Sequence, residues 1–540
     1  MFLIFIIYLH QIQLSMRCIS AVLLTMLLLI SSVAIIDFSS ADDDEYFSEN
    51  GRSYMKLDAD NVSLTYILDE YATQTITVGP TVTHGGHTYN IKKIQASIDC
   101  PIIEYVNLDS VVLEDVDGGA LIGRNIRSIT VNDSNPYLTS DGGVLYNKLQ
   151  TKLIRYPTAK EGNTFNVPTS VSEISSYAFY GSTLRTITIT GETLTNIGPS
   201  AFSGCGLLES VGSGGNLPES LVMIGSCAFC YCTSMSSLSL PDSVIYIGSY
   251  AFSGSGLSSI KIPYSVDYIG ECAFSDCTDL EEFESECDYY KAIDGVLYHI
   301  SGDDDKRKTL FCYPAGRVNE SFTILDDVVN ISPSAFSGTV KLKTIVLPAN
   351  MVSIPNMAFA HCGSLENIDL KNVSIIGNEA FYNCTGLKSV NFSDSLLHIG
   401  YSAFENTSIE TVTLPSSITS MDESVFYGCT KLTKVTIEES ARFTIMENTF
   451  FGCSSLNELT INSKDVILEE ESLSIGSEGD NVTLNLNVPS GFIVPDNVVN
   501  EDTTLVITYI GERPYPWVNI IGAIVCALGI IGILYGMRQV

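Results

Sequence analysis

One phenylalanine returns along this chain at a nearly constant spacing, and that spacing constrains the fold more than any other feature. An isoleucine or methionine lies five residues before each copy, and a cysteine, serine or threonine lies three residues after it. Successive copies are 22 to 27 residues apart, except for one gap of 62. Such a register indicates a stack of repeats, because a single-copy globular domain does not produce it. The eleven copies are Phe179, Phe202, Phe229, Phe252, Phe274, Phe336, Phe359, Phe381, Phe404, Phe426 and Phe450.

The rest of each unit is as regular as the phenylalanine. Residues Ile247–Val266 read IGSYAFSGSGLSSIKIPYSV, and apolar residues alternate near the end of the unit, as they do in a short strand. The isoleucine and the Ala-Phe pair are four and five residues apart, which is typical of one turn of helix. We therefore predict an α/β repeat, a right-handed leucine-rich-repeat solenoid of units of 22 to 24 residues.

The sequence pattern of the repeat unit resembles that of the BspA-type leucine-rich repeat family of cell-surface proteins. The resemblance extends from about Ala120 to Ile461. Members of that family are mostly surface adhesins and ligand-binding proteins, so the resemblance implies a binding function. It carries no catalytic residues with it.

The single long gap contains a segment that also occurs 152 residues upstream. Both copies have two apolar runs around a polar tip, which is typical of a β-hairpin. We predict hairpin inserts near 138–157 and 287–314, within a solenoid of residues 96–461. Residues 42–95 and 462–512 contain strand-like alternation and are predicted to be β-rich caps.

Seven of the fifteen cysteines occupy the repeat position that serine or threonine fills elsewhere, and we predict that they are buried free thiols. Cys287 and Cys312 flank the second insert and are the candidate disulfide pair.

The N-terminal residues 1–41 are predicted to be a cleaved secretory signal peptide. The uncharged segment Cys18–Ile36 follows Arg17 and leads to small residues before an acidic run. Two alternatives remain open, a true start at Met16 and an uncleaved signal anchor.

At the other end, residues 513–537 are predicted to form a transmembrane helix. Trp517–Tyr535 is apolar and long enough to cross a bilayer, and a tail of residues 538–540 follows the helix. The chain is then a single-pass type I membrane protein at the cell surface. Gly532 and Gly536 form a GxxxG motif, which can let two helices approach closely, so a homo-oligomer remains an open alternative.

The charge of the chain excludes one class of partner. With 28 basic and 62 acidic residues, the net charge is −34, which repels the phosphate backbone of nucleic acids. The acidic runs lack the ligand spacing of a calcium loop, and His84 and His87 lack a third metal ligand nearby. Motifs for a catalytic nucleophile or a phosphate loop are absent, so we predict no enzyme, no metal and no cofactor. Carboxylates that meet only in space leave a surface hydrolase as a remote alternative.

The candidate ligand face is the strand position between two buried columns, where side chains are free to vary without disturbing the core. Small polar residues dominate this row, and hydroxyls or amides there could bind a sugar or an extended peptide. The predicted face comprises Ser239, Lys261, Asp369, Asn391, Thr413, Thr436 and Thr460. We predict a membrane-anchored surface protein that binds extracellular protein or glycan partners in adhesion. The main alternative is a structural envelope component that self-associates.

Overall fold

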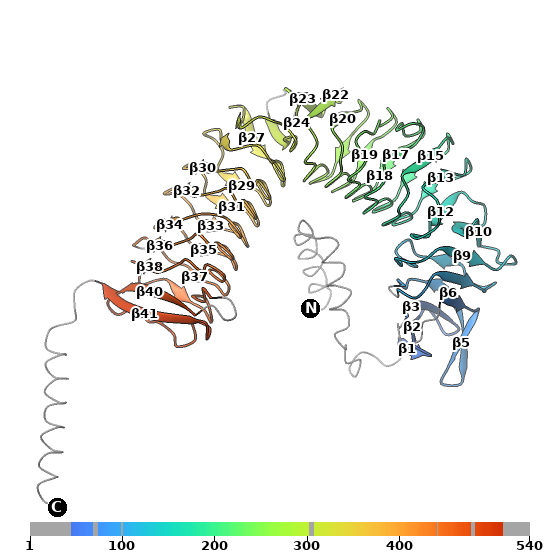
Figure 1. Ribbon diagram of the computed structural model, residues 1–540, viewed down its shortest axis with the longest axis horizontal. Helices are drawn as coiled ribbons and strands as arrows, with labels where there is room; N and C mark the ends of the chain where they lie inside the picture. The colour runs from blue at the N-terminus through green and yellow to red at the C-terminus, as the bar shows by residue number, and fades with distance from the viewer. Residues whose placement is uncertain are drawn as a thin grey trace, which may run out of the picture. The chain divides into compact units, whose positions relative to one another are not determined.

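The computed structural model describes residues 45–67, 74–98, 101–301, 307–439, 441–476 and 481–510. The chain divides into two compact units, Met1–Leu184 with Thr193–Cys205 and Arg185–Glu192 with Gly206–Val540. Within the described ranges, the regular secondary structure consists of β-strands, without a helix (Figure 1). The predicted signal peptide at 1–41, membrane helix at 513–537 and tail at 538–540 lie outside these residues.

Unit 1 contains three sheets and, outside them, the strand β13. Its strands are β1 Tyr46–Glu49, β2 Arg52–Lys56, β3 Asn61–Ile67, β4 Thr75–Val78, β5 Thr81–His84, β6 His87–Ile94, β7 Tyr105–Leu108, β8 Asp115–Val116, β9 Ser128–Val131, β10 Leu138–Asp141, β11 Val144–Asn147, β12 Lys152–Arg155, β13 Thr164–Val167, β14 Glu173–Ile174 and β16 Asn196–Ile197. The first sheet has the order β1-β2-β3-β6-β5 with β8 beside β6, and the second has the order β4-β7-β9. The third begins with the antiparallel strands β10-β11-β12 and continues through the parallel strands β14 and β16.

Unit 2 stacks its repeats so that successive strands form two parallel ladders along different sides of the coils (Figure 1). The first ladder contains β15 Thr186–Ile189, β17 Ser210–Val211, β20 Ser259–Ile262, β22 Glu282–Ser285, β26 Ser321–Thr323, β28 Thr344–Val346, β30 Asn367–Leu370, β32 Ser389–Phe392, β34 Thr411–Leu414, β36 Lys434–Ile437, β38 Glu458–Ile461, β40 Val482–Pro489 and β41 Thr503–Ile510. The second ladder contains two-residue strands only, β18 Met223–Ile224, β19 Tyr246–Ile247, β21 Tyr268–Ile269, β29 Ser353–Ile354, β31 Ile375–Ile376, β33 His398–Ile399, β35 Ser420–Met421, β37 Thr444–Ile445 and β39 Ile467–Leu468.

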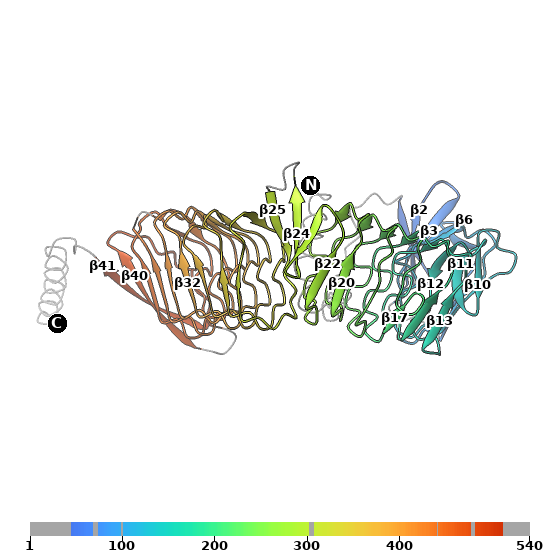
Figure 2. The same cartoon turned by 90° about the horizontal axis from the view of Figure 1, so that it is seen from above.

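Four strands interrupt this regular order in unit 2. They are β23 Tyr290–Ile293, β24 Val296–Ser301, β25 Arg307–Cys312 and β27 Val328–Ile331. Strands β23, β24 and β25 pair antiparallel, and β25 then pairs in parallel with β27, which returns the chain to the stack. Figure 2 shows β24 and β25 beside the coils that carry β20 and β22.

The repeating phenylalanines form a continuous column in the core of unit 2. From Phe336 to Phe450 the rings stack in sequence with centroids 5.0 to 5.9 Å apart, and all are fully buried. Alternating apolar residues of the first ladder, such as Val412 and Leu414, close the core on another side. The core is therefore made by stacking, since one coil alone could not bury its apolar residues.

The predicted turn of helix around the phenylalanine is wrong, and the fold is all-β instead of α/β. The residue two before the phenylalanine and the residue two after it both have positive φ, as at Tyr250 (58°) and Gly254 (65°) around Phe252. The Phe252 amide donates to the Ala273 carbonyl of the next coil at 2.8 Å, while the Ser253 amide donates three residues back. Left-handed residues cannot continue a right-handed helix, and amides committed to the next coil cannot close helical bonds.

A transmembrane helix was also part of the predicted fold class. Within the described ranges, no helix is long and apolar enough to cross a membrane.

The repeated cysteines are free thiols that bond to the phenylalanine column. Cys362, Cys384 and Cys453 each direct Sγ to the carbonyl oxygen of the preceding column phenylalanine, at 3.2, 2.9 and 3.0 Å. The predicted pair Cys287 and Cys312 are likewise separate buried thiols and form no disulfide in the structure. Cys287 Sγ lies 3.0 Å from the Val266 carbonyl oxygen.

Candidate functional site

A polar surface of unit 2 lies on the five-stranded sheet β34-β36-β38-β40-β41. Side chains alternate along each strand, so Val412, Val435 and Leu459 face the core while their neighbours face outward. The register aligns one outward position across all five strands, which places its side chains in one row. We call this set the polar row; it comprises Thr413, Thr436, Thr460, Asn487 and Thr508.

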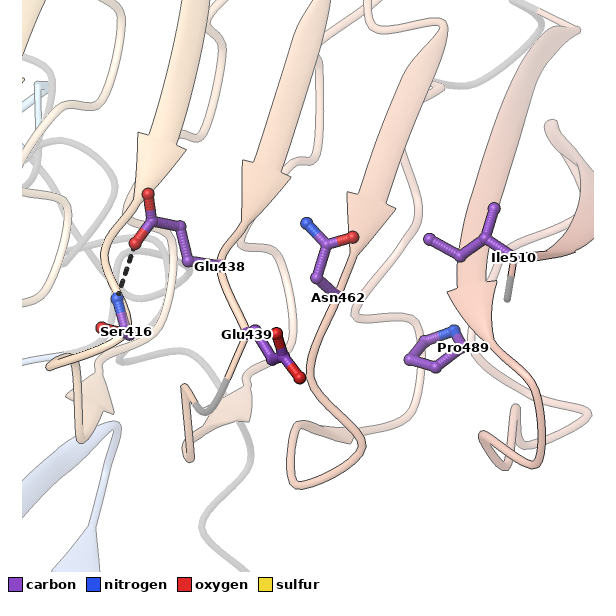
Figure 3. A pocket seen from close by; sticks show the side chains of 6 residues that line it. All are labelled: Ser416, Glu438, Glu439, Asn462, Pro489 and Ile510. Carbon is purple, nitrogen blue, oxygen red and sulfur yellow. Dashed lines mark hydrogen bonds between the residues drawn. The ribbon is translucent and has the colours of Figure 1, made fainter. Parts of the chain in front are cut away.

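A shallow groove of about 520 Å³ continues this surface at the ends of the strands (Figure 3). Residues Glu438, Asn462, Pro489 and Ile510 each stand two positions beyond a member of the polar row, so they share its face. The groove is lined by Ser416, Glu438, Glu439, Asn462, Pro489 and Ile510. The polar row and the groove therefore form one continuous surface.

Backbone hydrogen bonds hold the groove in the same register as the strands. The Glu438 amide donates to the Leu414 carbonyl at 3.0 Å, and the Asn462 amide donates to the Ile437 carbonyl at 2.9 Å. The Ser416 amide donates to Glu438 Oε2 at 3.3 Å, and this fixes the carboxylate at one end of the groove (Figure 3). The groove is thus pre-formed by the solenoid backbone.

The surface offers both donors and acceptors of hydrogen bonds. The carboxylates of Glu438 and Glu439 accept, the Asn462 amide does both, and Pro489 and Ile510 add apolar contact. Within the row, Asn487 Nδ2 donates to Thr460 Oγ1 at 3.2 Å. This combination suits a ligand that is polar, extended and largely uncharged or basic.

One ion pair borders the polar row. Lys434 Nζ lies 2.8 Å from Glu458 Oε1. The hydrogen bond from Lys434 lowers the pKa of the Glu458 carboxyl, so this group is ionised at neutral pH. The pair neutralises both charges at that edge, and the negative charge of the surface is left at the groove.

The structure distributes the seven predicted face residues among several sheets. Thr413, Thr436 and Thr460 lie together in the polar row. Asp369 and Asn391 are paired across β30 and β32 in a different sheet.

The remaining two residues of the predicted face lie apart. Lys261 is opposite Glu284 in the two-stranded sheet β20-β22, and its ammonium group lies 2.8 Å from Glu286. Ser239 forms an isolated bridge with Asn216. The seven residues of the predicted face therefore belong to four separate hydrogen-bonded groups of strands.

Sequence reasoning missed the groove and the last two members of the polar row. Asn487 and Thr508 lie in the segment predicted to be a cap, outside the repeat frame. The period of two would have found Glu438 and Asn462, because each follows a predicted face residue by two positions.

A second, smaller hollow of about 220 Å³ lies along β28 and β30. It includes the predicted residue Asp369, whose carboxylate is 3.1 Å from Lys371 Nζ. Among the residues that the structure describes, no group of three or more His, Cys, Asp and Glu side chains could hold a metal ion.

The chain matches the family model of the BspA type leucine rich repeat region in six copies, over residues 213–298, 311–433 and 352–475. No curated protein matches it.

Several solved structures resemble the chain. A leucine rich cell surface protein from Faecalibacterium prausnitzii is 23% identical, with a TM-score of 0.44, and the match covers 81% of this chain and 99% of that one. The pneumococcal vaccine antigen PcpA is 17% identical, with a TM-score of 0.49, and the match covers 86% of this chain and 99% of that one. A leucine-rich repeat protein from Eubacterium ventriosum is 19% identical, with a TM-score of 0.38 and coverage of 78% and 85%.

Proposed function

The chain is a BspA-type leucine-rich repeat protein, and we propose that it binds an extended extracellular ligand, a glycan or a protein segment, in cell-surface adhesion. The observation that carries this proposal is the continuity of the polar row with the groove. A row of hydroxyl and amide groups on a rigid sheet can bond repeatedly to a chain-like ligand, and the groove can hold its end. Such a surface binds without catalysing a reaction.

The groove itself favours binding over catalysis. It is shallow, and its two carboxylates belong to adjacent residues that follow one strand, Glu438 and Glu439. A glycosidase needs two carboxyl groups on either side of the bond that it cleaves. We therefore propose a non-enzymatic protein.

The proposal is tested with the ectodomain, residues 45–510, on arrays of glycans and of extracellular matrix proteins. A double variant, Glu438→Gln with Asn462→Ala, removes one charge and one amide from the groove and should weaken binding at least about tenfold, or about 1.4 kcal/mol. Glu470→Gln is the matched control, because Glu470 is also exposed in unit 2 but lies outside the groove. Equal binding by the double variant, or no ligand on either array, would contradict the proposal.

We further propose that the protein is secreted through residues 1–41 and held at the membrane by residues 514–537, which contain no charged side chain. Fractionation of expressing cells and protease treatment of intact cells test both steps. The full-length protein should sediment with membranes and be cut from outside the cell. A version that ends at residue 510 should be released into the medium, and its retention would contradict anchoring by this segment.

A second candidate function, a self-associating envelope component, is favoured by strand β41. This strand pairs with β40 and forms the end of its sheet as far as the structure describes it. Val506 and Tyr509 are 45% and 58% exposed, and none of the eight residues is charged. Uncharged edge strands pair readily with other chains. Light scattering of the ectodomain distinguishes the two functions, since self-association should be lost in Tyr509→Lys and adhesion should not, because Tyr509 alternates with the polar-row residue Thr508 along the strand.

A further inference from the structure

A patch of exposed apolar side chains lies on the second ladder of unit 2, away from the polar row. Strands β18, β19 and β21 pair in register, so that Met223, Tyr246 and Tyr268 stand opposite one another. Their neighbours Ile224, Ile247 and Ile269 point into the core and are buried. The patch is therefore built by the same alternation that builds the repeat.

The two tyrosines stack on each other. The ring centroids of Tyr246 and Tyr268 are 5.2 Å apart, with an angle of 16° between the ring planes. Tyr268 and Met223 are 45% and 42% exposed. Ile245, which is 48% exposed, adds to the patch beside Tyr246. We call Met223, Ile245, Tyr246 and Tyr268 the tyrosine patch.

The repeat does not require this patch. At the matching position of later coils, the second ladder has Ser353, His398, Ser420 and Thr444, with single apolar residues at Ile375 and Ile467. Scattered exposed apolar residues are ordinary, whereas adjacent ones mark binding surfaces. Tyrosine and methionine are also enriched at protein interfaces, where they supply contact area with little loss of side-chain freedom.

The coils that carry the patch are strongly acidic, and this favours a basic partner. Residues 206–290 contain twelve acidic side chains and one basic one, Lys261, which is paired with Glu286. Asp267 is exposed directly before Tyr268, and its amide donates to the Ile245 carbonyl at 3.0 Å, within the patch. Apolar rings beside carboxylates are complementary to arginine and lysine side chains, whose stems pack on the rings while their heads meet the carboxylates.

We propose that the tyrosine patch docks a basic segment of a protein partner, one that carries arginine or lysine next to apolar residues. This surface is separate from the polar row and the groove. Binding combines burial of the patch with attraction by the acidic repeats, so it weakens as the salt concentration rises.

The test uses the ectodomain and a fluorescent synthetic peptide of alternating arginine and leucine as the probe. The double variant Tyr246→Ser with Tyr268→Ser should bind the peptide at least about tenfold more weakly than the parent. Asp267→Asn should lower the affinity severalfold and reduce its dependence on salt. Ile375→Ser is the matched control, because Ile375 is also 45% exposed on the same ladder. This variant should bind the peptide with the affinity of the parent.

Thermal melting of each variant checks that the fold is intact. Equal binding by the parent and the double tyrosine variant would overturn the proposal, as would tighter binding of an acidic peptide or of a neutral oligosaccharide at the patch. The double variant Glu438→Gln with Asn462→Ala should bind the basic peptide normally, so failure of this inference is distinguishable from failure of the proposed function.

Discussion

At the scale of single residues, the repeat depends on a backbone conformation that most side chains avoid. The residue two before the repeating phenylalanine has a φ between 49° and 61° in all eleven copies, and none of these residues is glycine. Serine, tyrosine, cysteine, methionine, glutamate and asparagine all occupy this position. Each copy stores a small amount of strain, which the hydrogen bonds between coils offset.

This strain predicts opposite effects of two substitutions at Asn448, where φ is 59°. Asn448→Gly should leave stability unchanged or raise it slightly, because glycine adopts positive φ freely. Asn448→Val should lower it by about 1–2 kcal/mol, because a β-branched side chain clashes in this conformation. Urea unfolding of the ectodomain measures both, and similar midpoints for the two variants would contradict the argument.

Arg155 is a charged side chain in the core of unit 1. It is 1% exposed, and its Nη1 donates to the Tyr177 carbonyl, whereas its Nε and Nη2 have no hydrogen-bond partner among the described residues. Burial lowers the pKa of its guanidinium to about 10. An unpaired buried charge destabilises a fold. Arg155→Met should therefore raise the free energy of unfolding by about 1–3 kcal/mol, and the urea midpoint with it. A lower midpoint would show that the Tyr177 bond outweighs the buried charge.

The buried thiols make stability fall at alkaline pH. Burial raises the pKa of Cys205 to about 11, whereas a thiol in the unfolded chain ionises near about 8.5. Between these values the unfolded chain loses a proton that the folded chain retains, so stability is full below about pH 8.5 and declines as pH rises toward 11. From pH 8 to 10 this thiol contributes a loss of roughly 2 kcal/mol. In Cys205→Ser the free energy of unfolding should decline correspondingly less between pH 8 and 10. An unchanged slope of the free energy against pH would contradict this prediction.

At the scale of the element, the sequence predicted which residues are core more accurately than it predicted their backbone. The spacing placed Phe381, Ile376 and Cys384 in the core, and all three are fully buried. It also suggested helix, because a spacing of four residues arises equally from a helical turn and from a chain that reverses at two left-handed residues. Backbone bonds between coils decide between them, and a single-sequence pattern does not reveal such bonds.

The residues of the candidate site were likewise predicted only in part from the sequence. Thr436 and Thr460 were predicted as neighbours because the repeat aligns them, and the structure pairs them. Asn487, Pro489 and Ile510 were not predicted, because they lie beyond the last regular repeat, where the period no longer gives the register. The breaks between sheets, which separate Asp369 from Thr413, also leave no mark in the repeat frame.

At the scale of the element, we predict that a whole coil can be deleted without loss of the fold, whereas part of a coil cannot. Ser353 pairs with Ile375, so residues 353–374 form one coil of 22 residues. Deleting them joins equivalent points of the stack and should leave a soluble protein with a cooperative melt. Deleting residues 353–363 breaks the phenylalanine column and the ladders, and should abolish folding of the ectodomain. Circular dichroism and proteolysis compare the two, and equal damage from both deletions would contradict a modular stack.

At the scale of the whole molecule, charge is the dominant property. The net charge is −34 and the isoelectric point is about 4.3, and nearly all of the charge lies between residues 45 and 510. A charge this far from zero keeps a protein soluble but destabilises its compact state through self-repulsion. The ion pairs on the solenoid, such as Lys343 with Glu320, are mostly exposed and offset little of this repulsion.

Salt should therefore stabilise the ectodomain at neutral pH. Raising the ionic strength from 0.01 to 0.15 M shortens the Debye length from about 30 to about 8 Å, which screens repulsion between carboxylates on neighbouring coils. We expect the melting temperature at pH 7 to rise by several degrees, since about 1 kcal/mol shifts it by about 2–4 °C even in a large domain. Near pH 4.3 the net charge vanishes, so the same change of salt should have little effect. A salt response that is equal at both pH values would show that ion-specific binding, and not self-repulsion, controls the stability of this acidic solenoid.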